Sequence, residues 1–202
     1  MIVVGLTGSI AMGKTTVGAM FAKLGAPVFD ADAAVRAIYS GPTAGAVEEL
    51  FPGVLREGQV DREQLSQRVL NDPDALKRLE ELIHPAVKEA RGQFTDSAIA
   101  AGRRLVVVDV PLLFETGAQS EMDLVVVVSA PAQVQSARAL GREGMTAARL
   151  EAFLSRQLSD EDKRRRAHFV IDTSGAPERT EAQVSHFIRA VASLEGRKQR
   201  HA

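Results

Sequence analysis

The sequence contains no cysteine, which excludes disulfide bonds, thiolate catalysis and cysteine-ligated metals. Its formal net charge is only -1, so the total charge gives no indication of binding to nucleic acid or another polyanion. No apolar run approaches the length of a membrane span, and the short apolar stretch at the start lacks the basic residues of a signal peptide. We therefore expect a soluble cytoplasmic protein with neither a nucleic-acid nor a membrane partner.

The residues that are present indicate an ordinary globular chain. With 202 residues, 45% of them hydrophobic and 25% charged, the sequence is long enough for one α/β domain with insertions. We find no internal repeats and no linker that divides the chain into independent domains. The basic and polar tail, residues 195–202, is expected to fray.

Short β-branched runs alternate with helical patterns along the chain. The run at 124–129 is almost entirely apolar, as expected for a parallel strand covered on both faces. Helical patterns between the runs predict βαβ units and a parallel sheet. The predicted strands are residues 2–6, 105–110, 124–129 and 169–172, with a shorter fifth candidate at 27–30.

Two long blocks of the sequence have helical character. Between residues 30 and 105, Asp72 is placed as a helix cap, Pro73 as a first-turn residue, and helical spacing continues until Pro85. Residues 51–58 are predicted to be a loop. This first block predicts a helical subdomain beside a nucleotide site. The second block, from residue 131 to about 166, is again predicted to be helical.

The strongest motif is Gly-Ser-Ile-Ala-Met-Gly-Lys-Thr at residues 8–15, a complete G-x-x-x-x-G-K-[ST] phosphate-binding loop between a predicted strand and a predicted helix. Gly8 and Gly13 would let the backbone turn and approach a phosphate closely. Lys14 would reach the β- and γ-phosphates, and the Thr15 hydroxyl would bind Mg²⁺. The loop predicts a nucleoside-triphosphate site; a glycine-rich turn that caps a helix is the alternative.

Two carboxylates, Asp30 and Asp32, follow a short predicted strand and would face the crevice of the phosphate loop. Either carboxylate could accept a proton from an attacking hydroxyl. Capping of a helix at 33–39 explains one of them equally well. The spacing alone leaves the choice open.

Asp109 ends an apolar predicted strand, as in a Walker B motif, and would hold Mg²⁺ directly or through water. A simple strand-end turn is the alternative. Arg138 and Arg142 are four residues apart, which predicts one helix face suited to the charge of a transferring phosphoryl group. The basic run at 163–166 is better interpreted as a solvated surface. His84, before Pro85 at a predicted helix junction, has no partner in the sequence, and the histidines lack metal-ligand spacing.

Together these residues resemble the dephospho-coenzyme A kinase family over nearly the whole chain. The most particular motifs occur in one order: Asp30-Ala31-Asp32, then Ile83-His84-Pro85, then Pro111-Leu112-Leu113-Phe114-Glu115, followed by Gln135 and Gln157. The resemblance implies a P-loop kinase fold whose core, a parallel sheet flanked by helices, takes up about 1–31, 102–135 and 167–202. It also implies a helical acceptor subdomain at about 32–101 and a mobile lid over ATP at about 136–166.

The resemblance further implies ATP-dependent phosphorylation of the ribose 3′-hydroxyl of dephospho-coenzyme A, with Mg²⁺ as cofactor, by a monomer or weak homo-oligomer. Asp32 is the implied general base, and it lines the acceptor site with Arg36 and His84. Residues implied to contact the ATP phosphates are Gly8, Ala11, Met12, Gly13, Lys14, Thr15 and Thr16.

The sequence departs from the family pattern at several positions. Ala11 and Met12 stand where the family usually has Gly-Ser. Thr173 stands where the family usually has an asparagine, which puts a polar contact near the adenine in doubt. Phe153, four residues before Gln157, replaces a frequent arginine, so the lid is expected to be wired differently.

Two other functions remain as alternatives. Another small-molecule P-loop kinase, for a nucleoside, nucleotide or shikimate-like acceptor, fits the phosphate loop and the arginines equally well. The long helical insert and Ile83-His84-Pro85 argue against it. A regulatory P-loop ATPase is the second alternative, although the Asn-Lys-x-Asp of a guanine-reading switch is missing.

Overall fold

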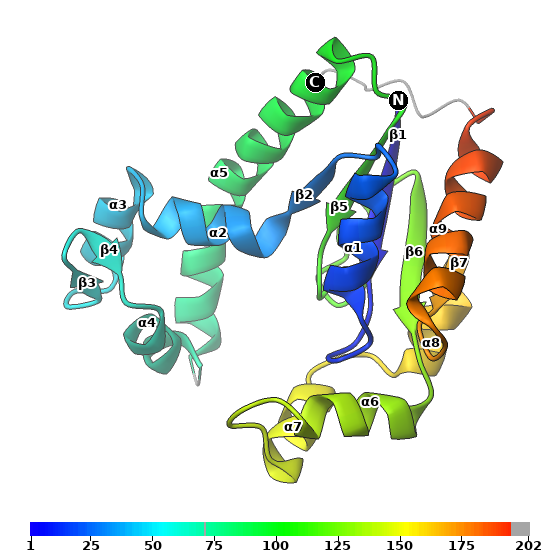
Figure 1. Cartoon of the computed structure of the whole chain (residues 1–202). Helices are drawn as coiled ribbons and strands as arrows, with labels where there is room; N and C mark the ends of the chain where they lie inside the picture. The colour runs from blue at the N-terminus through cyan, green and yellow to red at the C-terminus, as the bar shows by residue number, and fades with distance from the viewer. Residues whose placement is uncertain (71, 195–202) are drawn as a thin grey trace. The chain divides into compact units, whose positions relative to one another are not determined.

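The computed structural model describes residues 1–70 and 72–194 (Figure 1). The tail expected to fray, residues 195–202, lies outside the described residues. The chain divides into two compact units. The sheet unit is made of residues 1–29 and the described residues from 98 onwards, and the helical unit is residues 30–97. Across the described ranges, no helix is long and apolar enough to cross a bilayer.

A five-stranded sheet forms the centre of the sheet unit, in the order β2-β5-β1-β6-β7 (Figure 1). The parallel sheet predicted from the sequence is confirmed, since β1 pairs in parallel with β5 and β6, and β6 pairs in parallel with β7. The strands are β1 (Ile2–Thr7), β2 (Val28–Asp30), β5 (Leu105–Asp109), β6 (Leu124–Ser129) and β7 (Phe169–Asp172). The P-loop at 8–15 thus follows the central strand.

Helices α1 and α9 pack on one face of the sheet, where Phe21 meets Phe187 edge to face at 5.9 Å between ring centroids. On the other face, Leu113 and Met122 lie against Gly5 of β1. The helices of this unit are α1 (Lys14–Lys23), α6 (Ala132–Leu140), α7 (Ala147–Leu154), α8 (Asp160–Arg166) and α9 (Pro177–Val191), with a 3₁₀ helix η1 at Ala118–Glu121. Because both faces are covered, β6 can be apolar at every position from Leu124 to Val128.

The helical unit has a hydrophobic core of its own, which includes Val47, Phe51, Leu65, Leu79 and Ile83. Its elements are α2 (Ala31–Tyr39), α3 (Thr43–Leu50), β3 (Leu55–Arg56), β4 (Gln59–Val60), α4 (Arg62–Val69) and α5 (Pro73–Ala100), the last of which continues beyond the unit's end. The predicted cap is confirmed, because the carboxylate of Asp72 accepts hydrogen bonds from the N–H groups of Asp74 and Ala75.

Two predictions about this unit are wrong. The stretch 51–58, predicted to be a loop, contains β3 of a small antiparallel hairpin. The Glu48 carboxylate binds the N–H groups of Gly53 and Leu55 at 2.7 and 2.6 Å, which lowers its pKa and holds the start of the hairpin. The helix predicted to stop near Pro85 instead runs through it to Ala100 and is 28 residues long. Proline costs about 3 kcal/mol inside a helix, and here burial of apolar residues on both sides of it offsets that cost.

Candidate active site

The phosphate loop leaves β1 at Thr7 and enters α1 at Lys14, as the sequence predicts. Gly13 has a φ of +90°, which a residue with a side chain rarely adopts. A Cβ atom at Gly8 would lie 2.6 Å from the carbonyl oxygen of Val128 in β6. Glycine at position 8 is therefore required by the neighbouring strand, a reason that the motif alone does not reveal.

Ala11 and Met12, the residues bulkier than the family pattern, are built into the loop by packing. Ala11 has a φ of +62°, and its methyl group is buried in a small cluster with Ala139 and Leu150. Met12 is 1% exposed, and its sulfur accepts a hydrogen bond from the Ala130 N–H at 3.1 Å. These contacts hold the left-handed backbone at Ala11 in place.

Lys14 and Asp109 form an ion pair at the head of the loop. Both side chains are largely buried, 18% and 10% exposed. The structure thus brings together the amine predicted to bind phosphate and the carboxylate predicted to hold Mg²⁺. Thr15 and Thr16 follow in the exposed first turn of α1. A helix N-terminus with free N–H groups attracts anions, so this corner favours a phosphate chain.

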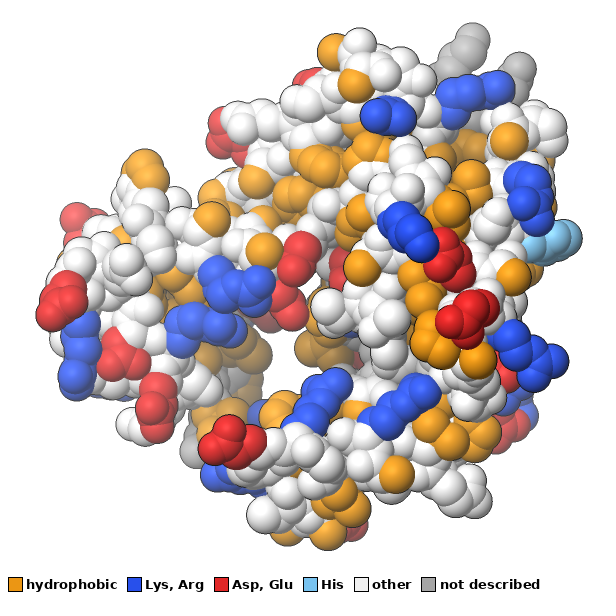
Figure 2. Space-filling view, viewed as in Figure 1, with side chains coloured by type: hydrophobic (Ala, Val, Ile, Leu, Met, Phe, Trp, Pro, Cys, Tyr) orange, Lys and Arg blue, Asp and Glu red, His pale blue; other side chains and the backbone are white. Residues whose placement is uncertain are grey.

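Beside the loop lies a cavity of about 380 Å³. Its lining residues are Ala11, Gly13, Thr16, Met20, Arg138, Arg142, Thr173, Gly175, Pro177 and Thr180. On the face shown in Figure 2, basic side chains lie over α6, the helix that carries Arg138. The predicted single helix face for the two arginines is wrong, because α6 ends at Leu140 and Arg142 lies beyond the capping residue Gly141. Both arginines nevertheless line the same cavity.

Arg138 is fixed by Thr173. Its guanidinium donates to the Thr173 hydroxyl at 3.0 Å and to the Thr173 carbonyl at 2.6 Å. The same hydroxyl donates to the carbonyl of Met12 at 2.7 Å. Thr173, a departure from the family pattern, therefore connects Arg138 to the phosphate loop. Arg138 and Arg142 are both exposed residues, and both line the cavity.

The predicted base and acceptor residues all belong to the helical unit. Asp30 caps α2, since its carboxylate accepts a hydrogen bond from the Ala33 N–H at 2.8 Å. Arg36 lies 3.7 Å from the same carboxyl group. Asp32 is exposed in the first turn of α2, and His84 is exposed within α5 rather than at a helix junction. The capping interpretation thus applies to Asp30, while the roles of Asp32, Arg36 and His84 stay predictions.

Comparison with known proteins identifies the family. The family model described as dephospho-CoA kinase matches residues 2–179. The chain belongs to the dephospho-CoA kinase family. The dephospho-CoA kinase of Rhodopseudomonas palustris (strain HaA2) is 48% identical over 198 residues, which cover 98% of this chain and 100% of the relative.

Solved structures agree with the kinase fold. A protein from Thermus thermophilus is 31% identical, with a TM-score of 0.82 over 96% of this chain and 98% of its own. The dephospho-CoA kinase from Campylobacter jejuni has a TM-score of 0.63 at 22% identity, over 94% of this chain and 96% of its own. At that identity the likeness shows the fold alone. The predicted α/β P-loop kinase fold is confirmed.

The sequence-based prediction for one basic residue of this family member is wrong. Lys163, predicted to belong to a solvated surface, has a side chain that is 0% exposed and lies 2.9 Å from the Glu115 carboxylate. Burial raises the pKa of Glu115, but the Lys163 ammonium and the hydrogen bond from the Leu158 N–H together lower it by more, so the pKa lies below its ordinary value. In a run of four basic residues, the sequence pattern does not distinguish the one buried side chain from its exposed neighbours. The only signal is Glu115 at the end of Pro-Leu-Leu-Phe-Glu.

Proposed function

We propose that this kinase transfers the γ-phosphoryl group of ATP to the ribose 3′-hydroxyl of dephospho-coenzyme A, giving coenzyme A and ADP. The observation that carries the proposal is the Lys14–Asp109 pair at the head of a phosphate loop, in a member of this family. The pair supplies one group for the phosphates and one for their counter-ion. We expect the enzyme to act as a monomer or weak homo-oligomer.

The phosphate loop binds ATP through backbone N–H groups and the N-terminus of α1. Lys14 adds a positive charge near the β- and γ-phosphates, where charge develops during transfer. Arg142, which is exposed and lines the cavity, complements the negative charge of the phosphoryl group during transfer. Arg138 forms a wall of the same cavity, because Thr173 holds it there.

Asp109 and Thr15 fit a Mg²⁺ site, because carboxylate and hydroxyl oxygens are the ligands this ion prefers. When bound, Mg²⁺ neutralises charge on the phosphate oxygens. Within the described ranges, no group of three or more acidic or histidine side chains is arranged to hold a metal. The protein would therefore share the ion with the nucleotide. Lys14, now paired with Asp109, would move its ammonium to the phosphates.

The acceptor requires a general base and a binding surface. Asp32 accepts the proton of the 3′-hydroxyl as that oxygen attacks phosphorus. The helical unit holds the rest of dephospho-coenzyme A, with Arg36 and His84 as contacts, and residues 136–166 form the lid. This assignment leaves Asp30 to its cap.

The direct test is to incubate the purified protein with ATP, Mg²⁺ and dephospho-coenzyme A and to detect coenzyme A by mass spectrometry. Adenosine, which presents a 3′-hydroxyl without the diphosphate and pantetheine, should react far more slowly, because remote contacts contribute binding energy to the reaction. Equal turnover of the two acceptors would indicate a nucleoside kinase. ADP release that is independent of any acceptor would indicate a regulatory ATPase.

A further inference from the structure

A buried ion pair lies in the sheet unit, outside the phosphate site. The Lys163 ammonium is 0% exposed and lies 2.9 Å from Oε1 of Glu115, whose side chain is 15% exposed. Burying two charges costs solvation energy, so such a pair is weak evidence for added stability. A buried pair can instead serve to fix one arrangement of the chain around it, and its surroundings show which one.

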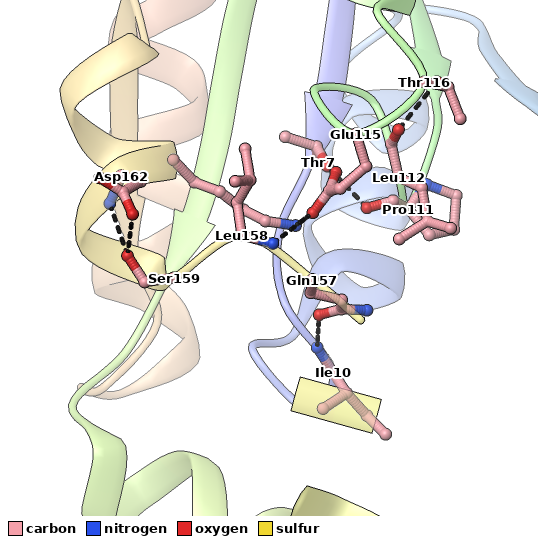
Figure 3. Close-up of polar contacts among 11 residues, drawn as sticks. Thr7, Ile10, Pro111, Leu112, Glu115, Thr116, Gln157, Leu158, Ser159 and Asp162 are labelled. Carbon is pink, nitrogen blue, oxygen red and sulfur yellow. Dashed lines mark hydrogen bonds and ion pairs between the residues drawn. The ribbon is translucent and has the colours of Figure 1, made fainter. Parts of the chain in front are cut away.

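Glu115 also holds the segment that joins α7 to α8. Its Oε1 accepts a hydrogen bond from the Leu158 N–H at 2.8 Å (Figure 3). The residue before it, Gln157, accepts a hydrogen bond through its side-chain oxygen from the Ile10 N–H at 3.3 Å. Ile10 belongs to the phosphate loop. The carboxylate thus fixes the backbone next to the side chain that holds the loop.

The phosphate loop is tied down at two further points. The carbonyl of Ile10 accepts a hydrogen bond from the buried Gln135 amide at 2.9 Å. The Thr7 hydroxyl, just before the loop, donates to the carbonyl of Pro111 at 3.0 Å, at the start of the turn that carries Glu115 (Figure 3). These contacts connect the loop, the turn after β5 and the α7–α8 segment in one ring of hydrogen bonds.

We propose that Glu115 and Lys163 are positioning residues for ATP: through Leu158 and Gln157 they hold Ile10, and so keep the phosphate loop in its binding conformation. A loop held in place before ATP arrives loses less conformational freedom on binding, and the saving appears as affinity. The inference rests on the proposed function only in taking ATP as the ligand of this loop.

The test measures ATP affinity by calorimetry without acceptor, and then the KM of each substrate. Gln157→Ala removes one hydrogen bond without burying a charge, and should weaken ATP binding about fivefold, the effect of one net hydrogen bond. Glu115→Gln should weaken ATP binding at least as much. The KM of dephospho-coenzyme A should stay within about twofold, as expected for loss of a group remote from the acceptor.

A matched control lies on α8, the helix that carries Lys163. Glu161 of α8 forms an exposed ion pair with Arg165, so Glu161→Gln should leave ATP affinity unchanged. If Glu115→Gln fails to fold because Lys163 is left unpaired, Glu115→Gln with Lys163→Met removes both charges. That double variant has no ion pair to fix the side chain at position 115 against the Leu158 N–H, so it should weaken ATP binding about as much as Gln157→Ala does.

A double-mutant cycle separates positioning from general destabilisation. If Glu115 acts through Gln157, the combined Glu115→Gln and Gln157→Ala variant should bind ATP little worse than the weaker single variant. Additive losses, or a Gln157→Ala protein with unchanged ATP affinity, would overturn the proposal. If the variants changed ATP affinity as expected but the wild-type protein formed no coenzyme A, the result would count against the proposed function alone.

Discussion

At the scale of single residues, we expect Asp30 and Asp32 to perform different tasks although only two positions separate them. Asp30 caps α2, and asparagine caps a helix as well as aspartate does. Asp32→Asn should lower kcat about 10²–10⁴-fold, as loss of a general base does, with the melting temperature and ATP affinity unchanged. Asp30→Asn is the matched control and should be mild in both assays. The reverse result would exchange the two roles.

The two cavity arginines should also behave differently. Arg142→Ala should reduce kcat by about 10²-fold or more, as expected for loss of an interaction made in the transition state. Because Arg142 is exposed, the change should not reduce stability. Arg138→Ala should reduce kcat less, and should lower the melting temperature because two hydrogen bonds to Thr173 disappear. Single-turnover kinetics and thermal unfolding check both. If Arg142→Ala raised only the KM of the acceptor, the residue would belong to the acceptor site.

At the scale of elements, α5 carries a side chain for the core and one for the surface in adjacent positions. Ile83 is buried in the core of the helical unit, whereas His84 is exposed. Because we propose that His84 contacts the acceptor, His84→Ala should raise the KM of dephospho-coenzyme A and leave the KM of ATP unchanged. Because His84 is exposed, the melting temperature should also stay unchanged. Ile83→Ala, its neighbour, should instead destabilise the protein by about 2–5 kcal/mol. An unchanged acceptor KM in His84→Ala would remove this histidine from the acceptor site.

Some elements of the fold could be predicted from the sequence and others could not. The strands and the phosphate loop could be predicted because apolar runs and glycine spacing are local signals. The continuation of α5 through Pro85 could not, because the burial that offsets a lost hydrogen bond depends on distant partners. The inward direction of Lys163 depends on Glu115, 48 positions away in the chain, so it too is invisible in the local pattern. The roles of Asp32, Arg36 and His84 stay predictions.

At the scale of the whole molecule, acid should unfold the protein through carboxylates whose pKa is lowered in the folded state. Backbone hydrogen bonds lower the pKa of Glu48 and Asp172, and Lys163 lowers that of Glu115 against the effect of burial. At acidic pH the unfolded chain then binds more protons than the folded chain. These carboxylates should therefore contribute their full stabilisation above the pKa of an unfolded glutamate, and the free energy of unfolding should decrease as pH falls below about 4.5.

Urea unfolding at pH 7 and at pH 4 measures this decrease. The Glu115→Gln variant, which has no carboxyl group to protonate at this position, should show a smaller difference between the two pH values. An equal difference in the wild type and the variant would mean that Glu115 does not contribute to acid sensitivity.

The order of the strands has a consequence for synthesis of the protein. β1 is made before its partners in the sheet, residues 105–109 and 124–127. The helical unit, by contrast, is one uninterrupted stretch, residues 30–97, with its own core. As the chain leaves the ribosome, this later segment can fold while the first strand still has both edges unpaired. β1 is thus the segment that most needs protection from aggregation until its partner strands have emerged.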